Sequence, residues 1–154
     1  MKPNAIVIHC SASRWGDAAV ITEWHKARGF YTCGYNAVIL NGHRSYAAKY
    51  VQALDGKIEP GRPENVRGAH CAAGGMNSRS LGVCLIGIPD WDKYPTPRQM
   101  AALIHYLTVK CRLYGILPDT IFQHSDFDKG KPLCASLGLK PIQAAVRASL
   151  AKAA

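Results

Sequence analysis

Three histidines and one cysteine have the types and positions that could support metal chemistry. His9 and His124 each end a short run that reads as a strand, and His70 lies beside another strand end. Ligands gather at such strand ends in open α/β sheets. Cys134 follows His124 by ten residues, across the polar loop 125–133. Imidazole and thiolate are good zinc ligands, and three protein ligands with one water make a catalytic site. The sequence therefore predicts a zinc site, although spacing without an H-E-x-x-H or C-x-x-C motif leaves a purely structural role open.

The remaining histidines and cysteines favour packing or surface roles. His25 and His105 lie inside helical patterns, and His43 follows a turn, where we expect it to be exposed to solvent. Four cysteines stand in apolar surroundings, where a free thiol behaves as a small core residue: Cys10, Cys33, Cys84 and Cys111. The absence of C-x-x-C excludes a zinc ribbon and a thioredoxin-type motif.

Alternating strands and helices must position these groups. Apolar runs and turn signals predict strands over 5–9, 35–40, 57–59, 80–86 and 120–124. Helical spacing predicts helices over 17–28, from Thr96-Pro97 to about Tyr114, and from Pro141 to about Lys152. Gly29 and Gly115 are the expected stops. The alternation predicts an α/β fold, one domain over 1–154, with a central mixed, mostly buried β-sheet flanked by helices.

Composition restricts the partners without choosing one. The chain has 154 residues, a formal net charge of +9 and a pI of about 9.4. Such charge favours polyanions: nucleic acid, a membrane surface or an anionic cell wall. The basic residues are scattered, so no specific nucleic-acid interface is indicated. No apolar run reaches the ~18–20 residues of a membrane span. The N-terminus lacks a convincing signal peptide, so we expect folding in the cytoplasm.

Six segments, in order along nearly the whole chain, carry a family resemblance. They are IVIHCSAS (6–13), ITEWHKARGFYTCGYNAVI (21–39), DGKIEPGRP (55–63), GAHCAAGGMNSRSLGVCLIG (68–87), TPRQM (96–100) and QHSDFDKGKPLCAS (123–136). Through them the chain resembles the zinc-dependent N-acetylmuramoyl-L-alanine amidases, the type 2 amidases that include phage lysozymes and relatives of peptidoglycan recognition proteins.

The resemblance implies a ligand set and a catalytic tyrosine. His9, His124 and Cys134 match the three zinc ligands of the family. Tyr35, in GYNAVI, matches a tyrosine beside the metal that supports the reacting carbonyl. Thiolate ligation requires a reduced Cys134, which suits folding in the cytoplasm.

The resemblance also implies residues on the cleft wall and a catalytic lysine. His70 matches a histidine at the wall, on the substrate side, although it could simply order the neighbouring loop. Asn77 matches a loop asparagine that shapes the cleft. The family carries lysine or threonine two residues before the last ligand, where this chain has Pro132. Lys131 is our candidate for that role, and Lys129 is the alternative.

The function implied is zinc-dependent hydrolysis of the amide between N-acetylmuramic acid (MurNAc) and L-alanine in peptidoglycan or muropeptides. We expect a monomeric phage or prophage endolysin, cytoplasmic until lysis and released by a holin. Three alternatives remain: a non-catalytic peptidoglycan-binding protein, a cytoplasmic muropeptide-recycling amidase, and binding to a phage RNA polymerase, for which the sequence identifies no surface.

One segment, 41–54, departs from the compact phage pattern. It could be a tolerated surface insertion. It could also form a flap beside the substrate groove, because Tyr46, Lys49 and Tyr50 offer ring stacking and charge. The sequence leaves both interpretations open.

Overall fold

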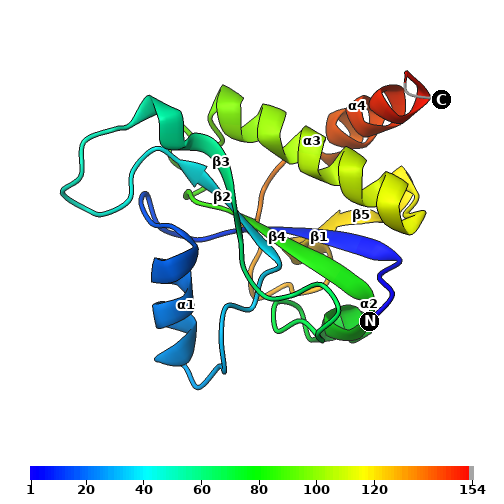
Figure 1. Ribbon diagram of the computed structural model, residues 1–154, viewed down its shortest axis with the longest axis horizontal. Coiled ribbons are helices and arrows are strands. Elements are labelled where there is room, and N and C mark those ends of the chain that lie inside the picture. The colour runs from blue at the N-terminus through cyan, green and yellow to red at the C-terminus, as the bar shows by residue number, and fades with distance from the viewer. Residues whose placement is uncertain (153–154) are drawn as a thin grey trace.

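A five-stranded mixed sheet forms the centre of the fold in the computed structural model, which describes residues 1–152 (Figure 1). The strands are β1 (Ala5–Cys10), β2 (Ala37–Asn41), β3 (Asp55–Pro60), β4 (Ser80–Leu85) and β5 (Ile121–Gln123). Their order is β3-β2-β4-β1-β5. Strand β1 runs parallel to β4 and β5, β2 runs parallel to β4, and only β3 is antiparallel to its neighbour.

Helices cover both faces of this sheet. Figure 1 shows α3 (Pro97–Tyr114) and α4 (Leu139–Ala151) on one face, and α1 (Ala18–Lys26) and α2 (Met76–Arg79) on the other. Single 3₁₀ turns η1 to η4 occupy Gln52–Leu54, Ala73–Gly75, Pro118–Thr120 and His124–Asp126. The α/β fold with a mixed, mostly buried sheet, predicted from the sequence, is confirmed. Over residues 1–152, no helix combines the length and apolar character that crossing a membrane demands.

The position of His9 follows from strand alternation. Along β1, Ile6 and Ile8 belong to the large core cluster that includes α3 and α4. Ala5 and Val7 belong to a smaller cluster with Met76 of α2. Because successive side chains in a strand point to opposite faces, His9 lies on the face of Ala5 and Val7. All six residues of β1 are buried, as expected for a central strand covered on both sides.

The longest helix, α3, begins and ends where its local signals predict. The Thr96 hydroxyl accepts a hydrogen bond from the Gln99 N–H, and the Gln99 side chain accepts one from the Thr96 N–H. This capping box satisfies backbone donors that the first turn would leave open. Gly115 ends the helix with φ of +69°, in the left-handed region where glycine costs least.

Strand boundaries differ from the sequence-based prediction by one to two residues, and the helices differ in three places. Helix α1 ends at Lys26 because Gly29, with φ of +86°, reverses the chain and the Phe30 N–H returns to the His25 carbonyl. Helix α4 begins at Leu139 because Pro141 lies within its first turn, where a missing N–H costs nothing. The single turn of α2 was not predicted, since four residues are too few to show a helical period.

The 41–54 segment leaves the sheet between β2 and β3 and projects from the side of the molecule (Figure 1). The Val51 N–H donates to the Gly42 carbonyl at 2.9 Å, which closes its base. His43, expected to be exposed, is partly buried; its ring centroid lies 5.5 Å from that of Tyr50. The sequence-based prediction for His43 was wrong because a turn signal does not reveal which rings fold over it.

Candidate active site

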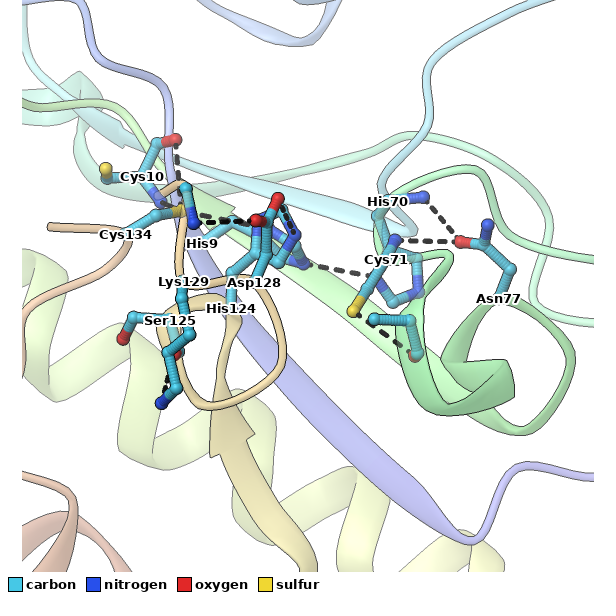
Figure 2. Close-up of polar contacts among 12 residues, drawn as sticks. His9, Cys10, His70, Cys71, Asn77, His124, Ser125, Asp128, Lys129 and Cys134 are labelled. Carbon is cyan, nitrogen blue, oxygen red and sulfur yellow. Dashed lines mark hydrogen bonds and ion pairs between the residues drawn. The ribbon is translucent and has the colours of Figure 1, made fainter. Parts of the chain in front are cut away.

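Two parallel strands bring His9 and His124 together. Ile8 of β1 is in register with Gln123 of β5, so the residues that follow, His9 and His124, meet at the same edge of the sheet. Their ring centroids are 4.6 Å apart and both side chains are buried. Cys134 completes the group: one ligand atom from each of these three residues lies within 4.8 Å of the others. Figure 2 shows the cluster.

The loop after β5 carries Cys134 back to the strand ends. The Ser125 N–H donates to the Cys134 carbonyl at 2.6 Å, which holds the two ends of the loop together. The Cys10 N–H donates to the Cys134 Sγ at 3.4 Å. His9 Nδ1 lies 3.9 Å from the same sulfur. The loop is thus fixed at both its own start and the end of β1.

The protonation states of these side chains suit a zinc ion. The neighbouring Cys10 thiol, followed by His124 and His9, lowers the pKa of Cys134 well below its usual value. The same pairing raises the pKa of Cys10, so one thiol of the pair keeps its proton. Burial lowers the pKa of His9. Zinc binds thiolate and neutral imidazole, so the donor set fits this metal.

His70 lies directly behind His9. Its Nδ1 is 3.0 Å from His9 Nε2, which leaves His9 Nδ1 on the side of Cys134. The ring packs over Gly68 and Gly82, where an added Cβ would come within 2.7 Å and 2.6 Å of it. Those glycines therefore let the histidine approach the sheet closely. Among residues 1–152, His70 Nε2 is a buried nitrogen that finds no hydrogen-bond partner.

Asn77 fixes the loop that carries His70. Its Oδ1 accepts hydrogen bonds from the backbone N–H groups of His70 at 2.7 Å and Cys71 at 2.8 Å (Figure 2). Its own carbonyl accepts from the Gly68 N–H. Both His70 and Asn77 also line a hollow of about 590 Å³. Substrate contact by either residue stays a prediction.

Tyr35 borders the three candidate ligands from the loop before β2. Its ring centroid is 4.9 Å from that of His9. Burial raises the pKa of its hydroxyl well above the usual value, so the group remains a proton donor. The ring centroid of His25 in α1 also lies 5.2 Å from that of Tyr35, and His25 accepts a hydrogen bond from the Gly34 N–H. His25 is therefore a packing residue, as its sequence context suggested.

Two hollows flank the ligand cluster, and His124 and Lys131 line both. The hollow of about 450 Å³ also contains Tyr35, Cys134 and Trp24. Lys129 lines only the larger hollow, and its ammonium group donates to the Ser125 carbonyl at 3.3 Å. We call the two hollows together the active-site cleft.

Asp128 and Cys10 are neighbours of the ligands that sequence reasoning did not single out for this site. The Asp128 carboxylate lies 3.8 Å from His124 Nε2. The separation of four residues along the chain, and the position of Cys10 directly after His9, are signals that could have marked them.

Comparisons with known proteins agree with this arrangement. Residues 1–134 match the model of the N-acetylmuramoyl-L-alanine amidase family. The endolysin of Enterobacteria phage K11 is 33% identical over 146 residues, which cover 90% of this chain and 84% of that protein. The amidase LysC from Clostridium intestinale URNW has a TM-score of 0.77 and 29% identity, over 96% of this chain and 87% of that one. Drosophila PGRP-LB, at 23% identity and a TM-score of 0.64 over 87% of this chain and 75% of its own, shares the fold. The chain belongs to the N-acetylmuramoyl-L-alanine amidase family.

Proposed function

We propose that this amidase hydrolyses the MurNAc–L-alanine amide of peptidoglycan with a zinc ion held by His9, His124 and Cys134. The observation that carries the proposal is the convergence of these three donor groups, within 4.8 Å of one another, between two hollows of the cleft. A substrate that spans the cleft can extend to either side of the metal. The layered fold carries the whole site, which supports treating 1–154 as one catalytic domain.

The bound zinc supplies Lewis acidity, which lets water act as a nucleophile at neutral pH. Hydrolysis joins the water oxygen to the lactyl carbonyl carbon and breaks the carbon–nitrogen bond. The leaving amine of L-alanine takes up a proton. The chain must therefore stabilise negative charge on the carbonyl oxygen and fix the amide in place.

Tyr35 and Lys131 are the side chains proposed for that task. The Tyr35 hydroxyl keeps its proton and can donate to the carbonyl oxygen. Lys131 lines both hollows, so its ammonium group can reach a substrate lying across the site. Lys129 is occupied by the Ser125 carbonyl and lines one hollow only, which supports Lys131 as the catalytic lysine.

His70 is better placed to position His9 than to bind substrate directly. If His9 donates its Nε2 proton to His70 Nδ1, its own Nδ1 lone pair is free for the metal. The side chain of Asn77 is committed to two backbone N–H groups. We propose that Asn77 shapes the cleft through the His70 loop.

The similarity to phage endolysins supports a role in cell-wall lysis. We propose that the protein acts on the wall after release from the cytoplasm by a holin. A muropeptide-recycling amidase would act on soluble fragments instead. A non-catalytic receptor would need no thiolate ligand, and Cys134 with its lowered pKa favours the enzyme.

Product analysis tests this proposal. Purified peptidoglycan incubated with the protein should release new L-alanine amino termini without new reducing sugar ends. New reducing ends would indicate a glycosidase. Binding to the wall without any new amino termini would support the receptor.

A further inference from the structure

A smaller hollow, of about 200 Å³, lies outside the active-site cleft. Three separate segments form it: the loop between β1 and α1, the 41–54 segment, and the loop between β4 and α3. Its lining consists largely of rings and polar groups, namely Arg14, Trp15, His43, Ser45, Tyr46 and Trp91. We call it the aromatic hollow.

The rings of the aromatic hollow are partly or largely open to solvent. Tyr46 is 88% exposed, and Trp91 is only partly buried. The Arg14 guanidinium lies 5.8 Å from the Trp91 ring centroid, and the His43 centroid lies 6.3 Å from it. Exposed ring surface gathered in a concave site with a few polar groups is typical of ligand binding.

The wall formed by 41–54 is held in place before any ligand arrives. The Tyr50 hydroxyl donates to the Asp55 carboxylate at 3.0 Å. Arg44 pairs with Asp17 and Glu59, each at 3.2 Å. A wall that is already ordered loses little conformational entropy on binding. This tethering argues against a loosely attached surface insertion.

The aromatic hollow borders the active-site cleft. The β1–α1 loop contributes Ser11 to the cleft and Trp15 to the hollow. The β4–α3 loop contributes Pro89 to the cleft and Trp91 to the hollow. Trp24, which lines the cleft, packs edge to face on Trp15 with 5.2 Å between ring centroids. The two shared loops and the contact between Trp24 and Trp15 place the hollow next to the cleft, so a polymer bound in the cleft can extend toward it.

We infer that the aromatic hollow binds a sugar ring of the peptidoglycan glycan strand, beyond the MurNAc whose amide is cut. A pyranose ring offers an apolar C–H face to aromatic rings and hydroxyl and acetamido groups to polar side chains such as Arg14 and Ser45. Within residues 1–152, no carboxylate lines the hollow, and Arg14 gives its lining a positive charge. The inference rests on the proposed amidase function, and it makes Tyr46 and Trp91 determinants of preference for polymeric substrate.

Kinetics on two substrates test the inference. Tyr46→Ala and Trp91→Ala should each raise KM for polymeric peptidoglycan about three- to tenfold, because each removes one ring on which the sugar would stack. Hydrolysis of a MurNAc-peptide, which carries no sugar beyond the MurNAc, should be unchanged. Trp91→Phe keeps a ring and should recover most of the affinity. Tyr31→Ala removes another exposed tyrosine, 93% exposed and outside every hollow described here, and serves as the control.

Binding without catalysis separates this inference from the amidase proposal. Calorimetry with a β-1,4-linked N-acetylglucosamine tetramer should detect binding to wild type and to Tyr31→Ala. Tyr46→Ala should lose this affinity. Equal tetramer binding in wild type and Tyr46→Ala, or no binding in either, would overturn the inference while leaving hydrolysis untouched. A stem peptide without sugar that displaces the tetramer from wild type, and that no longer binds Tyr46→Ala, would assign the hollow to peptide instead. Absence of hydrolysis on both substrates, with ring-dependent tetramer binding, would refute the amidase proposal alone.

Discussion

At the scale of single residues, the site depends on which atom of each side chain is available to bind a metal. His9 uses Nε2 toward His70 and keeps Nδ1 toward Cys134. The two adjacent thiols divide their roles, because Cys134 loses its proton more readily while Cys10 retains it. A zinc site needs both conditions: oriented neutral imidazole and an available thiolate.

Removing His70 should loosen the metal. In His70→Ala, His9 loses the partner that fixes its ring, so we expect zinc affinity to fall about 10- to 100-fold. Competition with a chromogenic chelator measures this directly, without reference to activity. His105→Ala, an exposed histidine of α3, is the matched control. Unchanged zinc affinity in His70→Ala would show that His70 does not position the ligand.

Tyr35→Phe should separate binding from catalysis. The ring that packs against His9 and His25 is kept, so zinc content and folding should match wild type. The lost hydroxyl should lower kcat about a hundredfold, as for the loss of one oxyanion donor. Steady-state kinetics with soluble muropeptide provide the measurement. A kcat equal to wild type would remove Tyr35 from the mechanism.

At the scale of elements, the sequence predicted those helices and strands whose ends are set by neighbouring residues. Thr96, Pro97 and Gly115 lie at the two ends of α3, next to the residues whose conformation they set, so the start of α3 was predicted to the residue. The strand ends that carry His9 and His124 were also predicted. Residue type and position indicated Cys134 as a third ligand, and the family resemblance implied the same set. The contact between His70 and His9, 61 residues apart, depends on tertiary packing and left no local pattern. The aromatic hollow likewise joins three distant segments, and of its residues the sequence indicated only Tyr46 as a candidate for substrate contact.

Gln99, in the first turn of α3, also binds the backbone of the sheet region. Replacing it should therefore lower the free energy of unfolding more than removing the N-cap hydroxyl alone. Gln99 is fully buried, and its amide donates to the carbonyls of Ile39 and Ile86 at 3.0 Å and 2.9 Å. Gln99→Leu removes both of these hydrogen bonds. The Ile39 carbonyl still accepts from the Ile86 N–H at 3.0 Å, so we expect the free energy of unfolding to fall by about 1–3 kcal/mol. Thr96→Ala should cost about 1 kcal/mol, and Thr96→Ser close to nothing. Urea denaturation measures all three; a Gln99→Leu variant as stable as wild type would contradict the argument.

At the scale of the whole molecule, the positive charge and the cleft act on the cell wall over different distances. A formal net charge of +9 attracts an anionic wall over roughly the screening length, which is about 10 Å at 0.1 M salt. The cleft and the aromatic hollow act only on contact. We expect the charge to bring the enzyme to the polymer and the side chains to select the bond.

Salt should therefore affect wall binding more than chemistry. Raising the salt concentration from about 0.1 M to about 1 M shortens the screening length to about 3 Å. Sedimentation with purified anionic walls should show binding weakened several-fold. Turnover of a small neutral muropeptide analogue should change much less. Wall binding independent of salt would exclude the charge as the attracting force.

Zinc content measured beside hydrolysis tests the central claim most directly. Wild type should contain about one zinc per chain, lose hydrolysis of peptidoglycan when a chelator removes the metal, and recover it when zinc is returned. His9→Ala and Cys134→Ala should lose metal and hydrolysis together, with circular dichroism confirming that the chain is folded. Full hydrolysis by zinc-free protein, or full zinc content in both variants, would contradict the assignment of His9, His124 and Cys134.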